Sequence, residues 1–345
     1  MAQRASDDKA PAVTVCVIAY NSGPTLRACL ESLEAQAFRD FETLVIDNAS
    51  PDRGDAAIAA DFPAMRLVSN ATNLGFAGAG NQAARLGAGR WLVLLNPDAV
   101  AEPDWLAELM AAAVRHPQVR SFTSRQMMAN EPGVLDGLGD VMSGYGIPYR
   151  GGYLRLYDGE AFEGEVFSPC GAAMMIDRAL FLELGGFCED FFCYCEDVDL
   201  GYRLQLAGEP TLLVPRAVIH HVGSASSGGR KSEFAVFHGT RNRFWVAFRN
   251  TPALLAPVVI PLHLAAVALI ASRRPNWPHA GVVWRAFVAA LKGLPKVLKD
   301  RRALQAARRA SAGDIARAMT WDPKDLAGRR PVIRPLRAPS RPAGS

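Results

Sequence analysis

Residues 13–50 read VTVCVIAYNSGPTLRACLESLEAQAFRDFETLVIDNAS, and this stretch decides the fold. Two short runs rich in β-branched residues, Val13–Asn21 and Phe41–Ser50, are typical of strands that are buried on both faces. Between them, Thr25–Gln36 repeats apolar residues at the spacing of one helix face. A strand, a helix and a second strand in this order predict two parallel strands joined by a helix.

The same alternation continues through the next part of the chain. Met65–Asn70 and Arg90–Ala99 are two further apolar runs with the length of buried strands. Helices are predicted after the second, third and fourth strands, at residues 54–61, 73–87 and 104–116. Strands that alternate with helices in this way predict an α/β fold with a mostly parallel central sheet.

The pattern changes further along. Ser121–Phe167 is rich in Gly and Tyr and lacks helical periodicity, so loops and irregular strands are predicted there. Ala172–Ile176 then predicts a strand and Arg178–Leu184 a helix. Cys195–Gly208 predicts a loop that feeds an amphipathic helix, and residues 211–221 predict a pair of strands.

Polar residues follow the predicted strands directly. In a parallel sheet, ligands bind at the carboxyl ends of the strands, so these residues are expected to meet at one rim. They are Tyr20, Asn21, Asp47, Asn48, Asn96, Pro97 and Asp98. Asp98 can hold a divalent cation against phosphate groups, and Asp47 can accept hydrogen bonds from a base or ribose. Both sequences, Asp-Asn and Asn-Pro-Asp, also suit plain turns.

A Gly-rich segment, Asn73–Asn81, opens the third helix. Its small residues let the backbone approach a ligand, and a helix N-terminus favours an anion. The spacing differs from the dinucleotide fingerprint G-x-G-x-x-G and follows the third strand, which disfavours a dinucleotide ligand.

Three carboxylates, Glu196, Asp197 and Asp199, gather at a predicted helix start. One of them can stabilise the helix N-terminus, or, for Asp199, bind a neighbouring arginine. A carboxylate in a partly apolar cleft can also act as general base towards a hydroxyl group. His220 and His221 offer a metal or phosphate ligand, although such histidines are often structural.

Taken in order, several segments resemble the family 2 glycosyltransferases, which have the GT-A fold. The segments are VIAYNS, LVIDNAS, NLGFAGAGN, LLNPDA, GAAMMIDRALFLELGGFCEDFFCYCEDVDLGYRL and HHVGSASS, and the resemblance covers about Val13–Arg249. The form Asn-Pro-Asp, where many family members have Asp-x-Asp, is most similar to a rhamnosyltransferase-like branch that builds O-antigen or cell-wall polysaccharides.

The resemblance implies an inverting, metal-dependent enzyme that moves a sugar from a nucleotide-sugar donor, with dTDP-rhamnose favoured, to a saccharide or lipid-linked saccharide. Asp197 would be the general base and Glu196 would help orient the acceptor. Asp98 and His221, or alternatively His220, would hold Mg²⁺ or Mn²⁺. The donor would contact Ala19, Tyr20, Asn21, Asp47, Asn48, Gly75, Phe76, Asn81 and Asn96. The alternative is a degenerate, non-catalytic subunit that binds a nucleotide sugar or glycolipid.

The last third of the chain is apolar and then basic. Pro252–Ala271 lacks charges, but its prolines and His263 disfavour a membrane span. Gly281–Asp300 predicts a basic amphipathic helix of the kind that lies in a membrane interface. The expected organisation is a disordered start (1–11), a GT-A domain (12–250), a helical extension that associates with a membrane or forms a homodimer (251–320), and a disordered tail (321–345).

Composition sets further expectations. The net charge is +4 and the basic excess lies towards the C-terminal end, without the aromatic interleaving of a nucleic-acid site. The N-terminal residues lack a signal peptide, so the six cysteines are expected to be reduced in the cytosol. The spacing of Cys188, Cys193 and Cys195 fits no standard zinc site. The expected location is therefore the cytoplasm, at the inner face of the cytoplasmic membrane.

Overall fold

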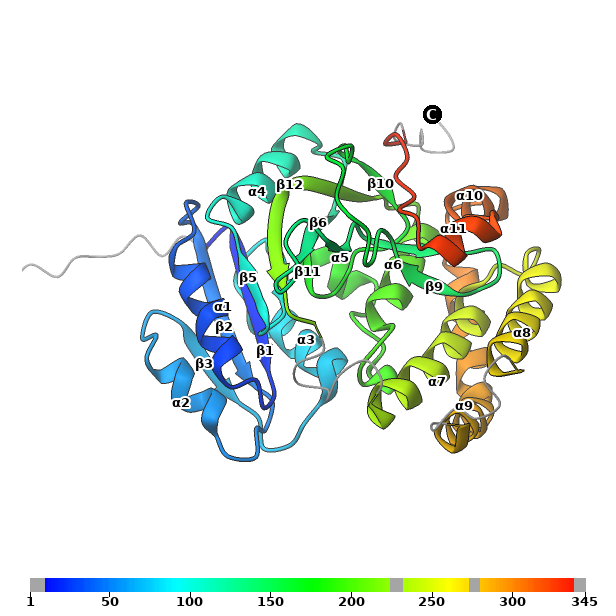
Figure 1. The fold of residues 1–345 in the computed structure, drawn as a ribbon, viewed down its shortest axis with the longest axis horizontal. Helices are drawn as coiled ribbons and strands as arrows, with labels where there is room; N and C mark the ends of the chain where they lie inside the picture. The colour runs from blue at the N-terminus through cyan, green and yellow to red at the C-terminus, as the bar shows by residue number, and fades with distance from the viewer. Residues whose placement is uncertain (1–9, 224–231, 273–279, 338–345) are drawn as a thin grey trace, which may run out of the picture.

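The computed structural model describes residues 10–223, 232–272 and 280–337. It is an α/β fold in which helices cover both faces of a central sheet, and a group of C-terminal helices packs to one side (Figure 1). The disorder predicted at both ends lies, for residues 1–9 and 338–345, outside the described residues.

The sheet runs in the order β10-β12-β6-β11-β4-β1-β2-β3, with β5 and β7 attached at its side. The half formed by β4, β1, β2 and β3 is parallel, which confirms the prediction from the sequence: β1 lies between β2 and β4, and β3 pairs with β2. β11 then runs antiparallel to both β4 and β6 and joins this half to the rest. The strands are β1 (Val13–Ala19), β2 (Phe41–Asp47), β3 (Arg66–Ser69), β4 (Trp91–Leu95), β5 (Ala99–Ala101), β6 (Ser121–Met128), β7 (Leu135–Gly137), β10 (Gly164–Val166), β11 (Ala173–Asp177) and β12 (Thr211–His221).

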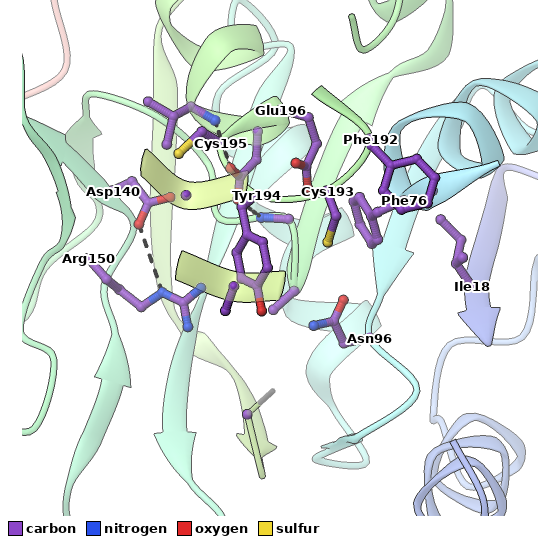
Figure 2. Close-up of a pocket in the computed structure, with 18 of the residues that line it drawn as sticks. Ile18, Phe76, Asn96, Asp140, Arg150, Phe192, Cys193, Tyr194, Cys195 and Glu196 are labelled. Carbon is purple, nitrogen blue, oxygen red and sulfur yellow. Dashed lines mark hydrogen bonds and ion pairs between the residues drawn. The ribbon is translucent and has the colours of Figure 1, made fainter. Parts of the chain in front are cut away.

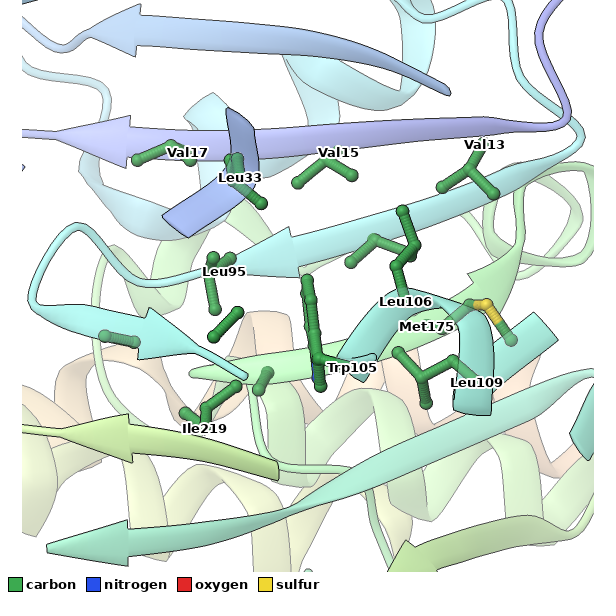
Figure 3. Packing of buried hydrophobic residues seen from close by; sticks show 14 of the residues in the cluster. Val13, Val15, Val17, Leu33, Leu95, Trp105, Leu106, Leu109, Met175 and Ile219 are labelled. Atoms are coloured by element: carbon green, nitrogen blue, oxygen red, sulfur yellow. The ribbon is translucent and has the colours of Figure 1, made fainter. Parts of the chain in front are cut away.

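Side-chain alternation along β1 divides the core into two layers. Val13, Val15 and Val17 face one layer, which helices α1 (Pro24–Glu34) and α4 (Trp105–Arg115) cover (Figure 3). Cys16 and Ile18 face the other layer. That layer is covered by α3 (Gly75–Leu86), α5 (Arg178–Glu183) and α6 (Glu196–Ala207), while α2 (Gly54–Ala60) follows β2. Because the strands lie between the two layers, both of their faces are buried, which explains why their sequences are continuously apolar.

The region predicted as loops and irregular strands contains several short strands, but β6 within it is a regular central strand, which the prediction did not include. Four polar residues of β6, Ser121, Thr123, Ser124 and Gln126, are fully buried and hide its apolar alternation. Trp105 Nε1 donates a hydrogen bond to Ser124 Oγ at 2.8 Å, which shows how one of them is satisfied. A small hairpin of β8 (Asp140–Met142) and β9 (Pro148–Arg150) follows.

The pair of strands predicted at residues 211–221 is instead one long strand, β12. Its pairing with β6 shifts register between Val214 and Val218, where a bulge includes Pro215 and the exposed Arg216. Proline has no backbone N–H for the ladder, so an irregularity at this point is expected. Ordinary pairing then resumes and carries His220 and His221 to the strand end.

Helices form the predicted extension, and among the described residues none is long and apolar enough to cross a bilayer. α7 and α9 pack against each other and, with α6 and α10, bury a third apolar cluster that includes Trp245, Ala290 and Ile315. A short 3₁₀ helix, η1 (Glu189–Phe191), precedes α6. The helices after α6 are α7 (Glu233–Asn250), α8 (Ala256–Ser272), α9 (Ala280–Ala306), α10 (Ala312–Ala318) and α11 (Pro323–Gly328).

The described part of the tail differs from the predicted disorder. Residues 321–337 form α11 and then an extended segment in which Arg334 exchanges backbone hydrogen bonds with Glu165. The Arg337 guanidinium pairs with the Glu165 carboxylate, which is buried. A buried carboxylate needs such a partner, and the tail supplies it from a distant point in the sequence.

Asp199 anchors the junction between the sheet domain and the C-terminal helices. Its carboxylate accepts hydrogen bonds from Arg203 (2.8 Å), Arg249 (2.6 Å) and Asn250 (2.8 Å). All these groups are buried. This arrangement confirms that Asp199 binds neighbouring arginines and explains how α6 and α7 are held together.

We expect Asp199→Ala to lower the free energy of unfolding by about 3–5 kcal/mol, because the buried Arg203 would lose its counter-charge and Arg249 would keep only Asp300, at 3.6 Å. Glu183→Ala, which removes an exposed partner of Arg309, is the matched control and should change stability little. Chemical denaturation measures both, and equal losses in the two variants would contradict this role for Asp199.

Candidate active site

A cavity of about 840 Å³ opens at the carboxyl ends of the parallel strands. Tyr20, Asn48 and Asn96 line it just beyond β1, β2 and β4. The start of α6 and the hairpin residue Arg150 contribute further walls, and Figure 2 shows their side chains around the same space. The cavity therefore lies at the edge of the sheet where the strand order predicts a ligand site.

Most residues that the sequence assigns to the site line this cavity. They are Tyr20, Asn48, Gly75, Phe76, Asn96, Asp98, Glu196, Asp197 and His221. The fold thus brings together strand ends, the Gly-rich segment, the acidic helix start and His221, which are far apart in the sequence.

The remaining four predicted residues, all assigned to the donor, lie outside the lining. Ala19 is fully buried in β1, and Asn21 is exposed with a left-handed backbone (φ 51°). Asp47 is buried, and its Oδ1 accepts a hydrogen bond from the Ser50 amide at 3.0 Å. Asn81 bonds both backbone groups of Phe187, at 2.7 and 2.9 Å. Their assignment to the donor stays a prediction.

Asn48 organises the Gly-rich segment. Its Oδ1 accepts from the Leu74 amide at 3.0 Å, and its Nδ2 donates to the Asn73 side chain at 2.9 Å. Gly75 follows with φ +69°, and a Cβ there would collide with the Phe192 carbonyl oxygen. Only glycine adopts this backbone readily, so the segment can turn tightly against the cavity.

His221 lies between two buried carboxylates. Its Nε2 is 3.1 Å from Asp98 Oδ1, and its Nδ1 is 2.8 Å from Asp136 Oδ2. Burial works to lower the pKa of His221, but the hydrogen bonds to Asp136 and Asp98 outweigh it and raise the pKa to about 9. His220 instead pairs with Glu102 at the surface, so His221 is the histidine that faces the cavity.

Asp98 and His221 fit a divalent cation that also binds phosphates. Their nearest ligand atoms are adjacent, both residues line the cavity, and oxygen and imidazole nitrogen are ligands that Mg²⁺ or Mn²⁺ accepts. An imidazole nitrogen binds a cation only when it carries no proton, so the cation would displace the proton from His221 Nε2, and its charge would replace that of the imidazolium beside Asp98. A second group, Asp140, Cys170 and Asp197, also has ligand atoms within 4.8 Å of one another. Burial raises the pKa of the Cys170 thiol, and a protonated thiol is a poor ligand for a hard cation.

Asp197 is half-buried and its carboxylate is held in place. Oδ2 accepts from the Gly171 amide at 2.8 Å, and Oδ1 from the Val198 amide at 2.8 Å. A Cβ at position 171 would approach Asp197 Oδ2 to 3.2 Å, so glycine gives the carboxylate its room. A fixed carboxylate at a cavity wall is suited to accept a proton from a bound hydroxyl group.

Glu196 is buried beside Asp197 on the cavity wall. Burial first, and then the neighbouring charge of Asp197, raise the pKa of Glu196 well above its ordinary value. Its Oε2 finds no hydrogen-bond partner among the described residues. An uncharged carboxyl group that lines the cavity can donate a hydrogen bond to an oxygen atom of a ligand.

The sequence did not predict three charged residues of the site, which are Asp136, Asp140 and Arg150. Arg150 Nη1 donates to Asp136 Oδ2 at 2.5 Å, and its Nε lies 3.9 Å from Asp140 Oδ1. All three belong to the short strands β7, β8 and β9, for which the sequence carries no clear periodicity. The only available signal was the presence of charged residues in a Gly-rich region.

The chain is similar in sequence to proteins of one family. Residues 14–182 match the sequence model described as glycosyl transferase family 2. N-acetylglucosaminyl-diphospho-decaprenol L-rhamnosyltransferase of Mycobacterium tuberculosis is 31% identical over 271 residues, which cover 71% of this chain and 87% of that protein. O-antigen biosynthesis protein RfbC of Myxococcus xanthus is 29% identical over 227 residues, which cover 63% of this chain and 18% of that protein.

Solved structures share the fold. TarS (residues 1–349) of S. aureus, in complex with UDP-GlcNAc, aligns with a TM-score of 0.57 at 15% identity and 92% coverage of both chains. Mannosyltransferase PcManGT of Pyrobaculum calidifontis, in complex with GDP-Man and Mn²⁺, aligns with a TM-score of 0.52 at 21% identity, covering 87% of this chain and 86% of that one. These structures confirm the predicted GT-A fold.

In the metal-free protein, we expect His221 to titrate with a pKa of about 9, above its ordinary 6.5, and Asp136→Asn to lower that pKa. Because the folded-state pKa is raised, the pairing stabilises the fold fully below about pH 6.5, and this stabilisation disappears as the pH rises through about 9. NMR titration of the imidazole nitrogens measures both proteins. A wild-type pKa of 6.5 or lower would contradict the paired geometry.

Proposed function

The chain belongs to the family 2 glycosyltransferases, and on that premise we propose that it transfers rhamnose from dTDP-rhamnose to a lipid-linked saccharide with inversion at the anomeric carbon. One observation carries the proposal: Asp98 and His221 line the same cavity as the fixed carboxylate of Asp197. A donor diphosphate and an acceptor hydroxyl group therefore have suitable protein groups within one cavity.

On the donor side, Asp98 and His221 would hold Mg²⁺ or Mn²⁺, which when bound neutralises charge on the leaving diphosphate. Two neighbours in fold, PcManGT and GalNAc-T7, were each solved with Mn²⁺, which supports a cation at this place. Asn48, Gly75 and Phe76 would contact the rest of the donor from the Gly-rich segment.

On the acceptor side, Asp197 would accept the proton of the attacking hydroxyl group. The hydroxyl oxygen forms a bond to the anomeric carbon, the bond from that carbon to the diphosphate oxygen breaks, and the electron pair leaves with the nucleoside diphosphate. The amide hydrogen bonds from Gly171 and Val198 fix the carboxylate for this step. Glu196, held uncharged, would orient the acceptor by donating a hydrogen bond.

The choice of sugar and acceptor rests on the mycobacterial relative. Its name specifies an L-rhamnosyltransferase whose acceptor is a saccharide on a diphospho-polyprenol. An acceptor of that kind resides in a membrane, and in this chain a polysaccharide of the bacterial cell surface would be the product. The reaction would take place at the inner face of the cytoplasmic membrane.

The outer side of α9 supports contact with such a membrane. Trp284, Leu291 and Leu298 are spaced seven residues apart and are 66%, 44% and 40% exposed. They form one apolar stripe, next to which Arg285, Lys292 and Lys299 form a basic stripe at the same spacing. Exposed tryptophan and leucine beside lysine and arginine favour an interface with anionic lipids.

We expect Asp197→Asn to keep nucleotide-sugar binding and to lower kcat by about 10²–10⁴-fold, because the amide cannot accept the proton. Asp190→Asn, an exposed nearby change, is the matched control and should retain activity. Transfer is measured with radiolabelled donor, and binding by calorimetry. Near-wild-type transfer by Asp197→Asn would exclude Asp197 as the base. If wild-type protein bound no nucleotide sugar, the result would contradict the proposed donor site.

For the membrane, we expect the triple change Trp284→Ser, Leu291→Ser and Leu298→Ser to lower binding to phosphatidylglycerol vesicles by about tenfold or more, since three apolar side chains are lost. Co-sedimentation measures the bound fraction. The matched control replaces exposed apolar residues elsewhere, in the triple change Val114→Ser, Leu156→Ser and Leu182→Ser. Equal binding by all proteins, with a loss of dimers only in the α9 variant, would make the stripe a homodimer contact.

A further inference from the structure

Two arginines on the cavity wall have no carboxylate partner among the residues that the structure describes. Arg243, from α7, and Arg329, just after α11, both line the cavity. Within residues 10–223, 232–272 and 280–337, neither guanidinium forms an ion pair. Arg243 Nε donates to the Gly239 carbonyl at 2.9 Å, and the Arg329 guanidinium lies 5.0 Å from the centre of the Tyr153 ring. Arg150 on the same wall, in contrast, is paired with Asp136.

The positive charges of this wall act on one another. Partial burial first, and then the charges of Arg243 and Arg150, lower the pKa of Arg329. Keeping like charges close together is unfavourable unless an anion binds between them. The wall is therefore prepared for a ligand with more than one negative charge.

The backbone holds Arg329 in position. Its φ of 48° and ψ of 41° are left-handed, which is uncommon for a residue with a side chain. The Gly152 amide donates to the Arg329 carbonyl at 2.7 Å, and Tyr149 Oη donates to the Arg330 carbonyl at 3.1 Å. These contacts fasten the tail to the hairpin region that ends in Arg150.

The two substrates would occupy different ends of the cavity. In Figure 2, Ile18, Phe76 and Asn96 lie towards one end, Asp140 and Arg150 lie towards the other, and Tyr194 lies between them. The strand ends and the Gly-rich segment, which would contact the donor, belong to the first end. Arg329 belongs with Arg150 at the second end, because its carbonyl accepts from the Gly152 amide, two residues after Arg150. The charges of Arg243 and Arg150 both act on its guanidinium, so Arg243 lies near it. Arg329 is exposed and therefore marks the rim of the cavity there.

We propose that Arg243 and Arg329 form a subsite for the diphosphate of an acceptor whose saccharide is joined to a lipid through a diphosphate. This inference rests on the proposed function. The saccharide would enter the cavity towards Asp197, and its diphosphate would remain at the rim between the two guanidinium groups. Guanidinium groups bind phosphate oxygens through paired N–H donors, and charge-assisted hydrogen bonds of this kind are strong.

Calorimetry with farnesyl diphosphate tests the subsite, using full-length protein already saturated with dTDP and Mn²⁺. Wild type should bind farnesyl diphosphate at least tenfold more tightly than farnesol. Arg243→Gln and Arg329→Gln should each weaken binding about tenfold, which is the loss expected for one charge-assisted hydrogen bond. Arg329→Lys should restore part of the affinity. Arg330→Gln, a change outside the cavity lining, is the matched control and should bind as wild type does.

Three results would overturn the subsite: equal affinity for farnesyl diphosphate and farnesol, unchanged affinity in both Gln variants, or displacement of dTDP by farnesyl diphosphate. The last result would assign the arginines to the donor diphosphate. Failure of the proposed function appears separately, as an absence of dTDP binding in wild type. In that case the same ranking of variants, measured in nucleotide-free protein, still decides whether the arginines bind a diphosphate.

Discussion

The contact of His221 with two buried carboxylates holds the two halves of the cavity together. Asp98 follows β4 of the parallel half, His221 ends β12, and Asp136 lies in β7. Arg150 continues the chain of charges from Asp136 into the β8–β9 hairpin. A positive imidazole between negative groups compensates the cost of burying them, and each partner fixes the position of the next. The donor end and the acceptor end of the cavity therefore keep a set distance.

The parallel half of the fold followed from the sequence because its signals are local. β1, β2 and β4 are buried on both faces, and their apolar runs and terminal polar residues are visible without any partner. The central place of β6 was not predicted, because its buried Ser121 and Thr123 find their hydrogen-bond partners only in distant parts of the sequence, Thr211 and Cys170. The same limit applied to Asp136 and Arg150, whose roles appear only when His221 is placed beside them.

The C-terminal tail also contributes to the cavity. Composition alone suggested disorder for residues 321–337, yet Glu165 and Tyr149 supply the contacts that order this segment. Once it is ordered, Arg329 joins Arg243 at the rim and changes the charge of the acceptor end. The acceptor end thus depends on the hairpin region and the tail, whereas the donor end depends on the strands and the Gly-rich segment.

The most direct test of the central claim is a thermal-shift panel of nucleotide sugars, each measured with Mn²⁺ and with EDTA. Binding of the donor alone stabilises the folded state, by about 2.7 kcal/mol when the ligand is at a hundred times its Kd. The measurement therefore needs no acceptor. We predict that dTDP-rhamnose raises the Tm in the presence of Mn²⁺ and that EDTA removes the increase. No increase with any nucleotide sugar, in a folded sample, would contradict the assignment of the cavity as a donor site, and an increase that persists in EDTA would contradict the cation site.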